Sequence, residues 1–164
     1  MKTFEKSLAI KSGLRKGFQD GTSKISRRKC YGYSTTPDNR LIIDPVQSEV
    51  VRWIFQRYLD GDSLGKITTS LEQQRIPSPT GKTKWSREAI DKLLSNEKYT
   101  GRVLLQKTIS IGTAQIENNG LMERYLYTGV HEAIISDEIF MAVQQVKLKR
   151  TKKPEDAIAM HLTF

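Results

Sequence analysis

The sequence predicts a mixed α+β fold that is mainly helical, with a helix-turn-helix-like core, a small β-hairpin or sheet and a protruding N-terminal helix. Two segments, 64–71 and 86–94, carry apolar residues at helical spacing and are joined by a polar, turn-rich connector. The strand-like segments 102–111 and 121–130 flank a hairpin turn signal at 118–120. These observations favour short helices packed together, followed by a small antiparallel element.

The two central helices have recognisable starts. Ser63 is placed to cap the first helix. Ser86 is placed to cap the second helix, and Glu88 in its first turn suits the positive end of the helix dipole. Trp85 precedes this cap and Ile90 is at the fourth helical position, which is the spacing of a hydrophobic staple.

The connector between these helices is basic. Lys82 and Lys84 precede the second helix, and Arg87 begins it. In a helix-turn-helix, the N-terminal residues of the second helix meet base edges in the major groove. These side chains are therefore placed to bind phosphate, or guanine in the case of Arg87. The connector is longer than the usual three or four residues, so a surface helical hairpin with solvated charges is the alternative interpretation.

A helix is also predicted on each side of this pair. The first is capped by Asp44, begins at Pro45 and ends at Gly61. Its predicted apolar stripe, at steps of four residues, consists of Val46, Val50, Ile54 and Tyr58, and Val51 and Phe55 widen it. The second is capped by Ser136. Its predicted inward-facing residues are Phe140, Val143 and Val146.

The ends of the chain are predicted to lie outside the folded domain, which we place at residues 31–146. Residues 1–30 predict the end of a linker helix, over 3–18, and then a basic arm. Residues 147–164 predict a basic C-terminal tail. The arm could follow a groove of DNA or could be a disordered tether.

The charge of the chain favours a polyanionic partner. The formal net charge is +9 and the isoelectric point is about 9.7. Nine of the 27 Lys and Arg residues, with only two acids, lie in residues 1–30. Nucleic acid is the first candidate partner and an acidic membrane surface the second. No apolar run approaches the roughly 20 residues of a membrane span. The single cysteine, Cys30, excludes an internal disulfide and fits a reducing cytoplasm.

No catalytic, cofactor or metal site is predicted. His131-Glu132 has the start of a zinc-protease motif, but position 135 is Ile, so no second His lies one turn further on. The carboxylates are scattered singly, and no Gly-rich phosphate loop is present. Two histidines in the whole chain give no evident Ser-His-Asp arrangement. We therefore expect that this polypeptide alone is not an enzyme and needs no cofactor.

Several segments together resemble the "recombinase" domain of large serine recombinases, the integrases of phages and mobile elements. The similarity covers about residues 31–145. The segments that carry it are 31–33, 40–45, 49–51, 54–55, 58–64, 67–71, 76–81, 85–86, 90, 94–101, 131–135 and 140. Residues 7–18 resemble the end of the long helix that links the family's catalytic domain to this one.

The resemblance implies a DNA-binding domain that binds double-stranded attachment-site DNA for site-specific recombination and integration. In the family, the serine nucleophile lies in an upstream resolvase-like domain and a zinc-ribbon domain follows, and we expect neither in this chain. The parent protein would act as a dimer or tetramer on DNA, in the cytoplasm of a bacterium, while the fragment would be a monomer. A stand-alone helix-turn-helix regulator is the alternative, and a protein–protein adaptor using the Phe4, Leu8 and Leu14 stripe is a second one.

On this interpretation, ten residues are expected to contact DNA. Those at the groove are Trp85, Ser86 and Arg87. Those that hold phosphates are Thr80, Lys82, Lys84 and Lys92. Those in the arm, along the backbone or the minor groove, are Arg27, Arg28 and Lys29.

Overall fold

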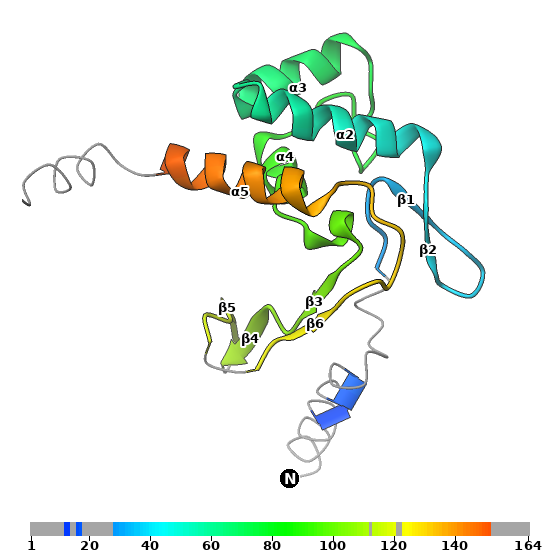
Figure 1. Ribbon diagram of the computed structural model, residues 1–164, viewed down its shortest axis with the longest axis vertical. Helices are drawn as coiled ribbons and strands as arrows, with labels where there is room; N and C mark the ends of the chain where they lie inside the picture. The colour runs from blue at the N-terminus through cyan, green and yellow to red at the C-terminus, as the bar shows by residue number, and fades with distance from the viewer. Residues whose placement is uncertain (1–11, 14–15, 18–27, 112, 121–122, 152–164) are drawn as a thin grey trace, which may run out of the picture. The chain divides into compact units, whose positions relative to one another are not determined.

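The computed structural model describes residues 12–13, 16–17, 28–111, 113–120 and 123–151 (Figure 1). It divides into two compact units. The β unit takes its described residues from 1–44 and 97–133, and the helical unit takes them from 45–96 and 134–164. The four described residues of the predicted linker helix are helical. The rest of that helix, most of the arm and residues 152–164 lie outside the described residues.

Among the described residues, four α-helices form the helical unit, as the sequence predicted (Figure 1). Their bounds are Pro45–Leu59 for α2, Leu64–Gln73 for α3, Arg87–Leu94 for α4 and Asp137–Thr151 for α5. Figure 1 shows α5 running alongside α2. With the short strands of the β unit, these helices confirm the mixed α+β, mainly helical fold class.

The helices begin and end for the predicted reasons. The backbone N–H of Lys66 donates to Ser63 Oγ at 3.1 Å, and that of Ala89 donates to Ser86 Oγ at 3.0 Å. Ser136 caps α5 in the same way. Gly61 follows α2 with φ +104°, a conformation that glycine adopts without steric cost. The hydroxyl caps satisfy N–H groups that have no partner inside a helix.

The buried face of α2 contains Val51, Ile54, Phe55 and Tyr58 of the predicted stripe, but the start of the stripe is not buried. Val46 is 75% exposed, Val50 is half-buried, and Ser48 is buried near the start of the helix. A step of four residues turns a helix by about 400°, so a strict four-residue series drifts around the axis. Over the twelve residues from Val46 to Tyr58 the drift is about 120°, which carries Val46 off the buried face. The fully buried core positions of the unit's helices are Val51, Ile54, Phe55, Ile67, Leu71, Ile90, Leu94 and Val143.

Helix α5 continues past the predicted end of the domain. Val143 is fully buried, whereas Phe140 and Val146 are half-buried. Lys147 Nζ lies 2.8 Å from Asp91 Oδ1 and also donates to Ser95 Oγ. Arg150 donates to the carbonyl oxygen of Asp62. Residues 147–151 are therefore part of a packed helix, and the predicted boundary at 147 falls inside it.

The β unit contains three antiparallel strand pairs and a short 3₁₀ helix, η2 (Glu97–Thr100). Strand β1 (Tyr33–Thr35) pairs with β2 (Leu41–Ile43) across the predicted turn at 37–40. Strand β3 (Val103–Leu105) pairs with β6 (Tyr125–Tyr127), with Val103 opposite Tyr127. Strand β4 (Thr108–Ile111) pairs with β5 (Ala114–Glu117).

The predicted pairing of segment 102–111 with segment 121–130 is confirmed in part, as β3 with β6, but residues 118–120 do not close a tight hairpin between them. Segment 102–111 is two strands, because Gln106 takes φ +62° between them. Asn118 is buried, its amide donates to the Gln106 carbonyl at 2.9 Å, and its N–H donates to the Lys107 carbonyl at 2.7 Å. The Asn118 side chain therefore stabilises the backbone between β3 and β4. The tight hairpin in this region is formed by β4 and β5. The return strand predicted within 121–130 is present as β6.

Candidate nucleic-acid interface

The starts of α3 and α4 come together at Arg87 and Gly65. Arg87 is exposed at the first position of α4, and its guanidinium lies over Gly65 in the first turn of α3. A Cβ atom at position 65 would lie 3.0 Å from Arg87 Nη2 and 3.3 Å from Cζ. The guanidinium therefore occupies the space that a side chain at position 65 would take. Two positive helix ends and one cation are gathered here, an arrangement that favours an anion.

Sequence analysis missed this role of Gly65. Glycine in the first turn of a helix is a weaker helix former than Ala by about 1 kcal/mol. A glycine at such a position is therefore the feature of the sequence that could have indicated a special role for Gly65. No local pattern indicates that a residue 22 positions further along the chain fills this space.

The connector before α4 is an ordered loop. Ser78 is buried, and its N–H donates to the Lys82 carbonyl at 2.8 Å while its Oγ accepts from the Lys82 N–H at 3.0 Å. Thr80 Oγ1 lies 3.1 Å from Ser78 Oγ, and Gly81 takes φ +80° at the turn. These bonds hold the exposed side chains of Thr80 and Lys82 on a fixed backbone.

The basic side chains of this surface differ in their partners. Lys84 pairs with Glu72 at 3.4 Å, and Lys92 pairs with Glu88 at 2.8 Å. The hydrogen bond between Glu88 and Lys92 lowers the pKa of the carboxyl and raises that of the amine. Exposed pairs of this kind are weak in water, so phosphate could replace the carboxylates. No described residue forms an ion pair with Lys82 or Arg87.

Trp85 lies at the end of the connector, directly before the N-cap residue of α4. Its side chain is 4% exposed, and the indole N–H donates to the carbonyl oxygen of Ile76 at 3.0 Å. This hydrogen bond therefore joins the end of the connector, at Trp85, to its start, at Ile76. This burial favours a structural role for the ring and argues against base stacking, and a contact between its exposed edge and DNA stays a prediction.

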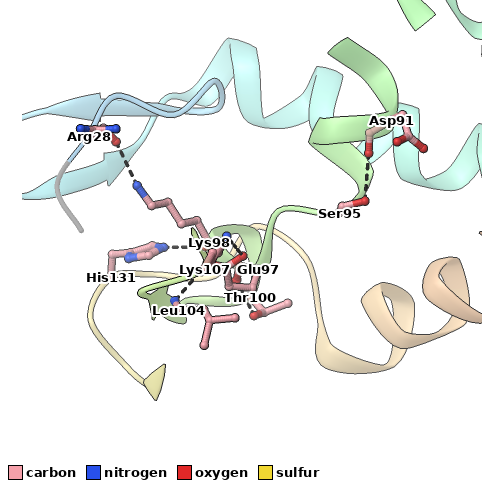
Figure 2. Close-up of polar contacts among 9 residues, drawn as sticks. All are labelled: Arg28, Asp91, Ser95, Glu97, Lys98, Thr100, Leu104, Lys107 and His131. Carbon is pink, nitrogen blue, oxygen red and sulfur yellow. Dashed lines mark hydrogen bonds and ion pairs between the residues drawn. The ribbon is translucent and has the colours of Figure 1, made fainter. Parts of the chain in front are cut away.

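The basic arm is described only at its end, in the β unit. Arg27 lies outside the described residues, while Arg28 and Lys29 are exposed. Lys98 Nζ donates to the Arg28 carbonyl at 3.2 Å (Figure 2). Burial of Lys98 lowers the pKa of its amine. This bond attaches the end of the arm to η2 and leaves both arm side chains facing solvent.

The same network holds His131. Its Nε2 lies 2.5 Å from the Lys98 carbonyl oxygen (Figure 2). Tyr33 Oη also donates to this oxygen. The Tyr33 hydroxyl lies 2.7 Å from the Glu132 carbonyl. Burial lowers the pKa of His131. These contacts explain His131-Glu132 as a structural tie.

Two features are absent from the ranges that the structure describes. Within those ranges, no group of three or more His, Cys, Asp or Glu side chains is placed to hold a metal ion. None of the helices in the same ranges is long and apolar enough to cross a membrane.

Comparison with known proteins identifies the family. A sequence model of the family described as "Recombinase" matches residues 45–150. The chain belongs to the Recombinase family. The matched range contains the whole connector and the starts of α3 and α4, and it ends inside α5. It leaves out Arg28 and Lys29.

Other relatives of this Recombinase-family chain are distant. The uncharacterized protein YbcK of Escherichia coli (strain K12) is 26% identical over 148 residues, which are 87% of this chain and 27% of that protein. Two solved structures share the fold. One, "Crystal Structure of a LSR-DNA Complex", has a TM-score of 0.52 and 21% identity and covers 77% of this chain. The other, "Sequence Requirements of the Listeria innocua prophage attP site", has a TM-score of 0.53 and 20% identity over the same share. This chain covers 34% and 45% of those two chains, respectively.

Proposed function

We propose that this chain is the DNA-binding domain of a site-specific serine recombinase and binds double-stranded attachment-site DNA for recombination and integration. The observation that carries the proposal is the exposed Arg87 guanidinium, held over Gly65 where two helix starts meet, in a chain of the Recombinase family. A guanidinium can make two parallel hydrogen bonds to guanine N7 and O6, or bind phosphate. The two helix starts add favourable potential for the DNA backbone.

The remaining residues that we expect to contact DNA take supporting roles. Ser86 Oγ accepts from Ala89, so its hydroxyl hydrogen is available to a phosphate. Lys82 offers an ammonium group that pairs with no described residue, and Thr80 lies on the same ordered loop. Lys84 and Lys92 would exchange their carboxylate partners for phosphate. Arg28 and Lys29 would contact the backbone or minor groove from the β unit, with Arg27 continuing the arm.

The likeness to an LSR–DNA complex supports this function. Because this chain spans only about a third of that protein, we assign strand cleavage to another part of a longer recombinase. We assign no catalytic role to any of the described residues. We further propose that the longer protein acts as a dimer or tetramer on DNA in the cytoplasm of a bacterial host.

A mobility-shift titration of the full chain against duplex DNA, repeated at several salt concentrations, tests the proposal. If about six phosphates are neutralised, log K falls with log salt with a slope of about −5. Lys82→Glu should weaken binding strongly. Lys149→Glu is the matched control, because it makes the same charge change on exposed α5 of the same unit. Binding that ignores salt, or that responds equally to the two variants, contradicts the proposal.

The sequence of the parent gene distinguishes a recombinase from a stand-alone regulator. The sequence that flanks this chain in its parent gene should encode a resolvase-like domain with a serine nucleophile. Its absence would favour the regulator, with DNA binding unchanged.

A further inference from the structure

A pocket of about 310 Å³ opens between the end of α3 and the connector. Its lining residues are Glu72, Arg75, Pro77, Gly81 and Thr83. All five belong to the helical unit and to the range matched by the Recombinase family. Gly81 separates Thr80 from Lys82, and Lys84 reaches Glu72, so the pocket adjoins the proposed DNA surface.

Arg75 occupies a backbone position that suits glycine. It follows the α3 C-cap residue with φ +56°, its N–H donates to the Glu72 carbonyl, and the next N–H, of Ile76, donates to the Leu71 carbonyl. These two bonds form a Schellman motif, in which this position is usually Gly. A side chain in left-handed conformation costs free energy. A long side chain at this position, against that cost, indicates that the guanidinium has a use.

The Arg75 guanidinium has no partner among the residues that the structure describes. The residue is exposed, and no described side chain or carbonyl forms an ion pair or hydrogen bond with the guanidinium. Glu72 is also exposed, and its contact with Lys84 is long, at 3.4 Å. The pocket therefore presents one unused set of donors and one weakly engaged carboxylate.

The Glu72 carboxylate restricts the kind of ligand that the pocket can bind. A phosphate offers only acceptors and carries negative charge, so Arg75 would attract it and Glu72 would repel it. A base edge can offer both kinds of group: guanine presents the acceptors N7 and O6, and cytosine presents the donor N4–H₂. Arginine is the usual partner of the first, and glutamate accepts from the second.

We infer that the Glu72–Arg75 pocket reads base edges in the major groove, with Arg75 donating to guanine and Glu72 accepting from cytosine, in one G·C pair or in adjacent pairs. The inference rests on the proposed DNA-binding function and adds two specificity-determining residues to it. Gly81 leaves its side of the pocket open, because no atom lies within 4 Å of where its Cβ would be.

The test is enrichment of a pool of duplexes with a randomised central segment, followed by titration of the enriched duplex and of a scrambled one. The full chain is compared with Arg75→Gly, Arg75→Lys, Glu72→Ala and the control Glu49→Ala, which removes another exposed carboxylate from the same unit. Arg75→Gly suits the left-handed backbone, so its melting temperature should not fall. Melts of all variants establish that they fold.

We expect the wild-type chain to enrich G·C at one or two adjacent positions that become unspecified in Arg75→Gly and Glu72→Ala. Affinity for the enriched duplex should fall about 5- to 100-fold, and affinity for the scrambled duplex by much less. Arg75→Lys should lose the same preference, because it keeps the charge and loses the planar fork. Glu49→Ala should keep the full preference.

The contrary outcomes are distinct. If Glu72→Ala tightens binding to every duplex while Arg75→Gly weakens it uniformly, the pocket holds a phosphate and the inference is wrong. If the wild-type preference survives in both variants, or if the wild type binds duplexes without any preference, the inference is also wrong while DNA binding stands. If the wild type binds no duplex, the proposed function fails and the inference fails with it.

Discussion

The guanidinium of Arg87 takes the place of a side chain at Gly65, with Nη2 3.0 Å from where a Cβ would be. This relationship couples the two helices that form the proposed DNA surface. It also separates two properties that most substitutions change together. A methyl group at position 65 improves the helix but moves the cation, so stability and binding should respond in opposite directions.

We therefore predict that Gly65→Ala stabilises the chain and weakens its binding to DNA. Alanine in a helical position should raise the free energy of unfolding by about 0.5–1 kcal/mol. The added Cβ displaces a flexible guanidinium, which can shift without disturbing the core. Denaturant titrations measure the first effect, and duplex binding at fixed salt measures the second, which we expect to be a several-fold loss.

Gly65→Ala in an Arg87→Ala background is the control. Without the guanidinium, the methyl group should still stabilise the helix and should no longer change the affinity for DNA. A loss of affinity of the same size in that background would mean that Gly65 acts on DNA by some route other than Arg87.

A second prediction separates base recognition from phosphate contact. Arg87→Ala should cost about 1–3 kcal/mol of binding free energy on a preferred duplex and much less on a scrambled one. Lys82→Ala should weaken both duplexes about equally and reduce the salt slope by about one. Both residues are exposed and unpaired among the described residues, so neither change breaks an ion pair there.

The two variants are titrated in parallel against both duplexes at matched salt. Equal losses for Arg87→Ala on the two duplexes would show that the start of α4 does not read bases. Specificity would then have to come from the Glu72–Arg75 pocket, from the basic arm or from DNA shape.

The third prediction follows from the burial of Trp85. Trp85→Ala should lower the free energy of unfolding by about 3 kcal/mol or more, because it removes a buried ring and leaves the Ile76 carbonyl without its donor. Trp85→Phe keeps most of the packing and loses the hydrogen bond, so its cost should be smaller. Urea titrations give both values.

Trp53 provides the comparison for Trp85. It is only half-buried on α2 of the same unit, so Trp53→Ala should cost less than Trp85→Ala. If Trp85→Ala left stability unchanged and abolished DNA binding, the ring would act at the interface and its assignment as a structural residue would be wrong.

Local signals predicted the helices well because their causes are local. Ser63, Ser86 and Ser136 cap the helices they precede, and each bond spans only three residues. The family resemblance likewise depended on short segments that can be compared one at a time. Such features need no knowledge of distant parts of the chain.

Contacts between distant residues were not predicted. Trp85 has the sequence context of a staple and of a groove residue alike, and its hydrogen bond to the Ile76 carbonyl, nine positions away, favours the structural role. Asn118 looks like a hairpin turn until its bond to Gln106 is known. Arg75 was missed because nothing local marks a left-handed arginine after α3.

The last prediction concerns His131 and the stability of the β unit at mildly acidic pH. Burial lowers the pKa of His131 in the folded chain relative to its ordinary value of 6.5. Below about pH 6.5, the unfolded chain therefore binds a proton that the folded chain does not. The stability associated with neutral His131 should be complete above pH 6.5 and should be lost as the pH falls toward the folded pKa.

Amide hydrogen exchange in β1 and β3, measured between pH 5 and 8 and corrected for the intrinsic exchange rate, tests this window. Asp38, Asp62 and Glu88 have lowered pKa values and ordinary values of 3.8 to 4.5, so their contributions change below this range. His131→Gln should weaken the dependence, because glutamine can donate to the Lys98 carbonyl and does not titrate. His161→Gln, the matched change at the other histidine, should keep it. Protection that is constant from pH 8 to 5 in the wild type, or that falls equally in His131→Gln, would mean that the burial of this imidazole does not set the acid stability of the β unit.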